Sequence, residues 1–191
     1  YADLTTYLIA VGEQLAGCTE VITADDNGVT LQAALNTTME NATICMPSGP
    51  GVTMSTNLTV PGHVNFVQHS PIIFSGTGIA LTIGSLTSQP YHRAYRLWVV
   101  RAIQSPWTSE EDIGIRFINV NTSDIHIVES RGFTVGVQYL ADGGCVCYNQ
   151  TKVQLILNNK IGIDLTLQHS GAPNANTFWG GRFAHNTGIG S

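Results

Sequence analysis

A short strand that contains glycine recurs along the sequence at a nearly constant interval, and this repeat constrains the fold more than any other feature. The copies read Ile113-Gly-Ile-Arg-Phe, Val135-Gly-Val-Gln-Tyr, Ile161-Gly-Ile-Asp-Leu and Thr187-Gly-Ile-Gly. Their glycines are separated by 22, 26 and 26 residues. We assign an earlier copy to Thr77-Gly-Ile-Ala-Leu, which places Gly78 in the same series, 36 residues before Gly114. The additional residues in that interval are expected to form a loop.

An interval of this length fits one coil of a right-handed parallel β-helix, in which short strands and their turns complete one winding. The segments between the repeats alternate apolar and polar residues, as half-buried strands do. These segments are Asp124-Ile-His-Ile-Val, Thr151-Lys-Val-Gln-Leu-Ile-Leu and Asn176-Thr-Phe-Trp. A β-sandwich also contains many short strands, but it gives no reason for glycine to return at a constant step. The sequence therefore predicts an all-β fold, a right-handed parallel β-helix (solenoid) with a short N-terminal capping helix.

A glycine at a fixed position in each coil indicates either a corner with positive φ or a close approach of two backbones. Asparagine is frequent near the same positions, where it can bond to the backbone of a turn or stack in ladders along a solenoid. The residues concerned are Asn119, Asn121, Asn158, Asn159, Asn174, Asn176 and Asn186.

The N-terminal part of the sequence has a different pattern. Residues 29–39 form the best helix candidate, with Leu31, Ala34, Leu35 and Thr38 on one face and Asp and Asn before it as cap candidates. Such a helix would cover the open end of the solenoid, whose unpaired edge would otherwise aggregate. We predict that residues 1–24 are an N-terminal connector segment. Residues 25–191 are predicted to be the β-helix domain, truncated at its C-terminal end because the sequence stops inside a repeat.

The composition excludes several classes of function. Charged residues make up only 11% of the chain and the net charge is −5, so there is no basic stripe for nucleic acid. No apolar run reaches the roughly 18 residues that a membrane span requires. The histidines are dispersed without the spacing of a metal site, and neither a metal nor a cofactor is expected. The polar positions hold mostly Asn, Thr, Ser and Gly, which suit a surface that binds sugars by hydrogen bonding.

The four cysteines fit no zinc pattern. Cys145 and Cys147 would share one face of a strand, a position that we interpret as unfavourable for a bond between them. Buried free thiols are the simplest interpretation. A bridge between Cys18 and Cys45 is compatible with the sequence but is not established by it.

At the N-terminal side, the order of motifs resembles the pectate-lyase-like β-helices of bacteriophage tailspikes and tail appendages. The motifs are Gln32-Ala-Ala-Leu-Asn, Ile44-Cys-Met-Pro-Ser-Gly and Leu58-Thr-Val-Pro-Gly-His-Val. The later Ile113 to Leu140 and Asn174 to Phe183 segments are similar to stretches common in tailspikes, so the resemblance covers about residues 24–191. It implies a homotrimer on a phage tail, in contact with other virion tail proteins, that binds host surface polysaccharide. Many members of the family also cleave that polysaccharide.

Glycan hydrolysis uses two carboxylates that flank the scissile bond, and polysaccharide lyases use a base and a charge stabiliser. The weak catalytic candidates in the coils are Glu129, Asp142 and Asp164. Glu129 has the same strand parity as Arg131, which also fits an ordinary surface ion pair. Asp164 lies outside the apolar positions of the repeat and is expected to point to solvent.

Sugar binding uses aromatic rings for the apolar faces of the sugars, and amides or Arg for their hydroxyl groups. The candidate ligand-binding residues are Trp107, Tyr148, Trp179, Arg182 and His185. Trp179 and Arg182 flank Gly180-Gly181, where the backbone could open a groove. Three functions remain in competition: a virion receptor-binding protein, a polysaccharide lyase or glycoside hydrolase that is virion-bound or extracellular, and a purely structural fibre segment.

Overall fold

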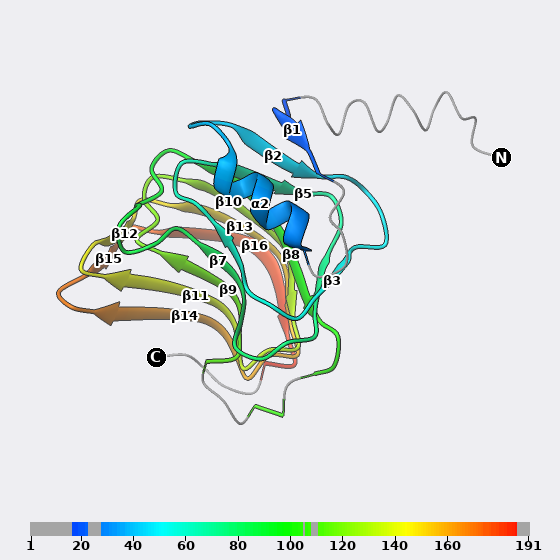
Figure 1. The fold of residues 1–191 in the computed structure, drawn as a ribbon. Coiled ribbons are helices and arrows are strands. Elements are labelled where there is room, and N and C mark those ends of the chain that lie inside the picture. Colours follow the sequence, from blue (N-terminus) through cyan, green and yellow to red (C-terminus); the bar gives the residue numbers. More distant parts are fainter. Residues whose placement is uncertain (1–16, 23–27, 105, 108–110, 187–191) are drawn as a thin grey trace.

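The computed structural model describes residues 17–22, 28–104, 106–107 and 111–186, and these form a right-handed parallel β-solenoid of about six turns with one short helix (Figure 1). Every strand pair in the solenoid is parallel, and the strands form three sheets. Successive strands of one sheet are separated by a complete winding, so neighbours in space are far apart in sequence. The predicted fold class is confirmed.

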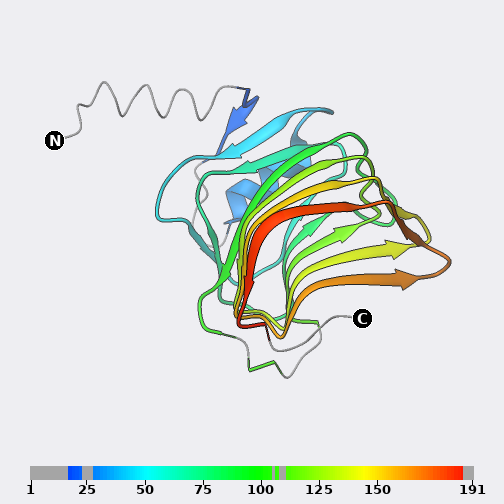
Figure 2. The ribbon, with the colours of Figure 1, turned by 180° about the vertical axis from the view of Figure 1, so that it is seen from behind.

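Sheet A carries the largest face of the solenoid. Its strands are β1 (Glu20–Val21), β2 (Thr43–Met46), β3 (Val52–Met54), β5 (Asn65–Gln68), β6 (Ile72–Phe74), β8 (Ala94–Arg101), β10 (Asp124–Arg131), β13 (Gln150–Leu157) and β16 (Thr177–Ala184). Figure 2 shows β8, β10, β13 and β16 side by side, with β16 (red) at the C-terminal edge. Both β5 and β6 pair with β8, so the short strands of the early coils continue into the long strands of the later ones.

Sheet B continues the windings, and sheet C completes two of them. Sheet B contains β4 (Leu58–Val60), β7 (Ile79–Ile83), β9 (Ile113–Ile118), β11 (Val135–Asp142) and β14 (Ile161–Gln168), and sheet C contains β12 (Cys145–Cys147) and β15 (Ala172–Asn174). A coil in the C-terminal half therefore runs through sheet A, then sheet B, then sheet C.

The glycines of the repeat form a column in sheet B. Val135 pairs with Ile113 on one side and with Ile161 on the other, so the glycines that follow these residues lie opposite one another. The prediction of a column at Gly114, Gly136 and Gly162 is therefore confirmed. None of these three glycines has positive φ. Close approach is the reason for glycine: a Cβ on Gly136 would lie 2.6 Å from Asn159 Nδ2 and 2.8 Å from the Gly162 carbonyl oxygen.

The assignment of Gly78 to this column is wrong. Ile79 of β7 pairs with Ile113, so Ala80 and not Gly78 lies opposite Gly114. The interval before Gly114 contains the long connection between β8 and β9, which changes the spacing. The residue in register with Gly114 is therefore Ala80, a small residue but not a glycine. Gly78 has φ of 84° and lies in the turn before β7.

The predicted asparagine ladders are present at the corners of the coils. The side-chain oxygen of Asn149 accepts a hydrogen bond from the backbone N–H of Ser123 (3.0 Å), and that of Asn176 accepts one from the N–H of Asn149 (3.2 Å). At another corner, Asn186 accepts from the N–H of Asn159 (3.1 Å). Each amide thereby satisfies a turn N–H of the preceding coil, which sheet pairing leaves without a partner.

The predicted helix is present as α2 (Val29–Thr37), two residues shorter than expected at its C-terminal end. Leu31 and Leu35 are fully buried and extend the core of the coils, and α2 lies beside the N-terminal coils in Figure 1. The residue before the helix is Gly28, with φ of 69° and no side-chain cap. The expected Asp and Asn caps lie at 25–27, outside the described residues.

The described part of the predicted connector, residues 17–22, contributes β1, which pairs with β2 of sheet A. The boundary at residue 24 stays a prediction.

The expectation of free thiols is wrong. Cys18 is bonded to Cys45, with a Cα–Cα distance of 5.9 Å, and Cys145 is bonded to Cys147, with a Cα–Cα distance of 5.4 Å. The second pair shares one face of a strand, as the sequence indicated. That position nevertheless gives a Cα–Cα distance within the range observed for disulfide bonds.

One continuous core fills the solenoid. Aromatic rings contact one another inside it: Phe117 and Tyr139 are stacked at 4.7 Å, and Tyr139 and Phe178 meet edge to face at 5.4 Å, measured between ring centroids. The Tyr139 hydroxyl bonds to the Thr151 hydroxyl at 2.7 Å. A buried ion pair between Arg101 and Asp112 closes the connection between β8 and β9. The fold therefore places a rigid core behind every outward-facing position of the sheets.

Candidate functional site

The outward face of sheet A brings together residues that are 26 to 30 positions apart in the sequence. Arg96 of β8 lies opposite Val67 of β5 and His126 of β10. Lys152 of β13 lies between His126 and Trp179 of β16. We call these five residues the sheet A column. It consists of Val67, Arg96, His126, Lys152 and Trp179.

A hollow of about 390 Å³ follows this column across the coils. All five column residues line it, together with Ala94, Tyr95, Asp124, Ile125 and Gln150. Neighbouring strands lie roughly 4.8 Å apart, so the column extends over about 19 Å. This geometry suits an extended ligand that runs parallel to the solenoid axis.

The column has a local excess of positive charge. Arg96 and Lys152 flank His126 directly, and Asp124 is the one acidic side chain among the described residues that line the hollow. Burial lowers the pKa of His126 below its usual value, and the charges of Arg96 and Lys152 lower it further. The His126 imidazole is therefore mostly neutral at pH 7 when no anion is nearby.

Two groups of the column have unused hydrogen-bonding capacity. The Nε2 atom of His126 is buried and has no hydrogen-bond partner among the described residues. Arg96 donates from Nη1 to the backbone carbonyl of Gln68, which leaves its charge without a carboxylate. Buried polar atoms without a partner are uncommon in native structures and call for an explanation.

Trp179 is the predicted binding residue that lies in this hollow. Its side chain is 51% exposed. Gly180 and Gly181 follow it with φ of 73° and 90°, a conformation that L side chains rarely adopt. A Cβ on Gly181 would lie 2.9 Å from Val153 Cγ1, so the backbone packs closely on β13 there, and the predicted opening of a groove beside Trp179 stays a prediction.

The other predicted binding residues lie elsewhere on the surface. Arg182 is three residues further along β16 and faces Leu155, and His185 follows the end of the strand. Tyr148 is 59% exposed at the corner between β12 and β13. Trp107 lies in the connection between β8 and β9, at the opposite end of the sheet A strands. Their role in binding stays a prediction.

The three candidate carboxylates lie on two sheets, and the register pairs none of these three with another. Glu129 on sheet A accepts from Trp98 Nε1 (3.0 Å) and forms the expected ion pair with Arg131 (3.3 Å). Asp142 bonds to His169 Nδ1 at 2.7 Å. Asp164 does not point freely to solvent, because its carboxylate accepts from the Gln138 side chain at 2.9 Å.

The sequence interpretation missed Arg96, His126 and Lys152. Each is a single outward residue in a different coil, and none belongs to a local motif. The predicted strands that begin at Asp124, Thr151 and Asn176 nevertheless contain His126, Lys152 and Trp179. An alignment of those three strands would have placed the three residues side by side.

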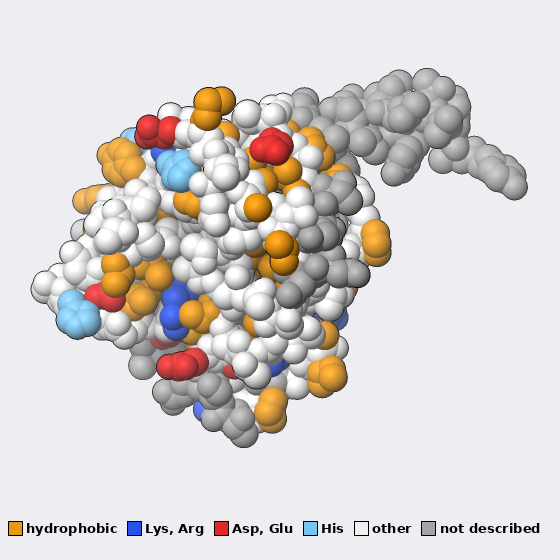
Figure 3. Space-filling view, viewed as in Figure 1, with side chains coloured by type: hydrophobic (Ala, Val, Ile, Leu, Met, Phe, Trp, Pro, Cys, Tyr) orange, Lys and Arg blue, Asp and Glu red, His pale blue; other side chains and the backbone are white. Residues whose placement is uncertain are grey.

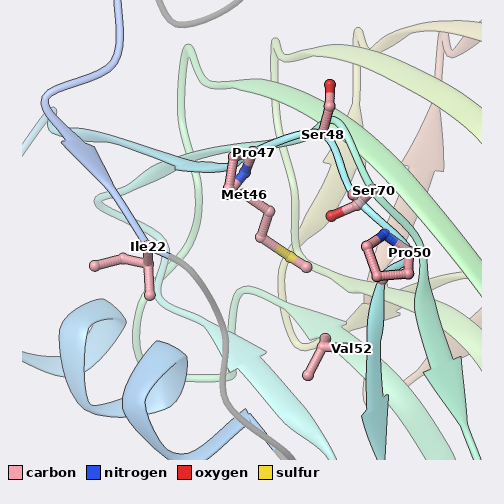
Figure 4. A pocket seen from close by; sticks show the side chains of 9 residues that line it. Ile22, Met46, Pro47, Ser48, Pro50, Val52 and Ser70 are labelled. Carbon is pink, nitrogen blue, oxygen red and sulfur yellow. The ribbon is translucent and has the colours of Figure 1, made fainter. Parts of the chain in front are cut away.

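A second hollow, of about 240 Å³, lies among Met46, Pro47, Pro50 and Val52, beside Ile22 of the N-terminal segment (Figure 4). Its lining contains no ionisable side chain, so it offers no charge with which to orient a ligand. Figure 3 shows another face of the molecule, where charged side chains are few. Within the described residues, no group of three or more His, Cys, Asp or Glu side chains could hold a metal ion.

Comparisons with protein-family models, with curated proteins and with solved structures found no match for this chain. Among the described residues, no helix is long and apolar enough to cross a membrane.

Proposed function

We propose that this protein binds surface polysaccharide and that the hollow along the sheet A column is its binding groove. The observation that carries this proposal is the alignment of Trp179 with polar and charged side chains from successive coils along one groove. A polysaccharide repeats its groups along one axis, and the solenoid repeats its outward positions along one axis as well. A groove that crosses the coils therefore matches the form of such a ligand.

The chemistry of the groove supports the same proposal. An exposed indole offers an apolar face on which a sugar ring can stack, and its N–H offers one donor. Gln150 and Asp124 line the groove beside the column and can bond to sugar hydroxyl groups. Because the aromatic core lies directly behind these strands, the side chains are held on a rigid surface, which reduces the entropy lost on binding.

From the resemblance of residues 24–191 to tailspike β-helices, we further propose that the protein is a receptor-binding component of a phage tail. In this proposal it assembles as a homotrimer with other virion tail proteins and recognises the host surface polysaccharide. A secreted or extracellular location is the alternative. Sedimentation of the full chain tests the assembly, and a monomer would contradict it.

Binding is the activity that we assign to the sheet A column. Most glycoside hydrolases use two carboxylates about 5 to 9.5 Å apart, and Asp124 is the only acidic side chain among the described lining residues, so the groove does not supply that pair. Release of reducing ends from a bound polysaccharide would show that a depolymerase activity is also present.

The test is binding of the full chain to a panel of bacterial capsular polysaccharides and lipopolysaccharide glycans, followed by isothermal titration calorimetry. The Trp179→Ala variant is expected to bind a positive glycan at least about tenfold more weakly, which corresponds to about 1.4 kcal/mol. Tyr91→Ala is the matched control, because Tyr91 has a similar exposed fraction, 54%, and does not line the groove. Absence of binding to every glycan, or equal affinity of the wild type and Trp179→Ala, would contradict the proposal.

A further inference from the structure

The sheet A column stacks three basic side chains on neighbouring strands of a chain that is acidic overall. The sequence has 8 Lys and Arg against 13 Asp and Glu, yet Arg96, His126 and Lys152 occupy consecutive positions of one column. Arg96 and Lys152 lie on either side of His126, and their like charges repel each other. This repulsion is a cost to the fold unless an anion neutralises it.

Among the described residues, no carboxylate forms an ion pair with the sheet A column. The ion pairs of the described residues join Arg101 to Asp112, Arg131 to Glu129 and His169 to Asp142, and none of them involves the column. Asp124 lines the hollow on the same strand as His126, but it is not among the charges that shift the pKa of His126. The positive charge of Arg96 and Lys152 thus remains available at the surface.

We propose that the groove is selective for acidic polysaccharide, with a carboxylate or sulfate group of the glycan held over His126 between Arg96 and Lys152. This inference rests on the proposed function and names the class of glycan. Arg96 and Lys152 donate charge-assisted hydrogen bonds to the anionic group. His126 lies between them, and a bound anion favours its protonated form.

The position of Trp179 favours a sugar acid over a free inorganic anion as the ligand. It continues the column directly after Lys152, so the anionic group and the stacked ring would belong to adjacent units of one ligand. Single-stranded nucleic acid also combines negative charge with stacking groups. We favour the glycan because nucleic acid carries a charge about every 3.4 Å along each strand, whereas the groove offers two charged basic groups, Arg96 and Lys152, within a chain of net charge −5.

The experiment compares polysaccharides that differ only in charge. An acidic capsular polysaccharide that binds in the panel is tested beside its carboxyl-reduced or desulfated form, and dextran sulfate is tested beside dextran. Loss of the anionic group is expected to weaken binding at least about tenfold. Arg96→Gln and Lys152→Gln are each expected to weaken binding to the acidic form about fivefold or more, and the affinity is expected to fall as salt rises.

Lys160→Gln is the matched control, because it removes the same charge outside the groove, and its affinity is expected to stay within about twofold of the wild type. Thermal unfolding of each variant verifies that it is folded.

Equal binding of the charged and neutral forms, with Trp179→Ala still weakening both, would overturn the acidic selectivity and leave the proposed function standing. Unchanged affinity in Arg96→Gln and Lys152→Gln would overturn the assignment of these residues. Equally tight binding of single-stranded DNA would overturn the choice of glycan, and absence of all glycan binding would contradict the proposed function itself.

Discussion

Sheets A and B each carry an outward column with one residue from each of five strands, and the two columns differ in how their polar groups are satisfied. The sheet B column consists of Thr59, Thr82, Arg116, Gln138 and Asp164. Arg116 donates to the Gln138 side chain (2.7 Å), which in turn donates to Asp164 (2.9 Å). In the sheet A column, Arg96, His126 and Lys152 make no such bonds to one another. The side chains of the sheet B column bond to one another and stabilise the fold. The basic side chains of the sheet A column do not bond to one another, and we propose that a ligand binds them.

The largest effect on stability is expected within the glycine column of sheet B. Gly136→Ala should lower the free energy of unfolding by about 3 kcal/mol, because its Cβ would meet the Gly162 carbonyl and the Asn159 amide inside a close-packed region. Gly162→Ala is the matched change on β14, where the nearest atoms are 3.4 Å away, and it should cost less than about 1 kcal/mol. Urea unfolding measures both. Equal costs would show that close approach is not the reason for these glycines.

The next largest effect compares the two outward columns directly. Gln138→Ala should lower the free energy of unfolding by about 1 to 2 kcal/mol, because Arg116 and Asp164 both lose a partly buried partner. Lys152→Ala removes a residue at an equivalent place in the sheet A column and should change stability by less than about 0.5 kcal/mol. Gln138→Ala should leave glycan binding unchanged. Reversed results, with Lys152→Ala the more destabilising, would remove the distinction between the columns.

The smallest effect is a pH dependence that arises from His126. Its pKa in the folded protein lies below the usual value, first because of burial and then because of Arg96 and Lys152. The unfolded chain therefore binds more protons as the pH falls below about 6.5, and stability is lost over that range. His126→Gln should lose less stability than the wild type between pH 7.5 and 5, as measured by urea unfolding.

An acidic glycan should change this behaviour, because a bound anion favours protonated His126 against the charges of Arg96 and Lys152. With saturating acidic polysaccharide, the loss of stability at low pH should shrink or reverse. Asp124 also lines the groove, and Asp124→Asn serves as the control for its contribution. Identical pH profiles of the wild type and His126→Gln, with and without the glycan, would contradict this coupling.

The repeated glycines were enough to predict the solenoid, because backbones can approach closely at one place in each coil only where the side chain is absent. The same signal failed at Gly78, where a long connection changes the interval and Ala80 takes the position in register. Register is a property of hydrogen bonding between coils, and spacing alone does not determine it when the loops vary in length.

The candidate site was less accessible from the sequence. Trp179 is visible as an aromatic residue beside two glycines, but Arg96, His126 and Lys152 are ordinary alternating residues until their strands are aligned. The pairing of Cys145 with Cys147 was misjudged for a related reason: a shared face indicated the direction of the side chains, but not that the two Cα atoms lie only 5.4 Å apart.

Because each winding contributes one member to the sheet A column, the number of windings sets the length of the proposed glycan contact. Inserting or deleting a complete winding of about 26 residues would lengthen or shorten the contact by one step of roughly 4.8 Å. An insertion confined to the connection between β8 and β9 would leave the step unchanged, since that connection lies outside the paired strands. Recognition length and loop variation can therefore evolve independently in this architecture.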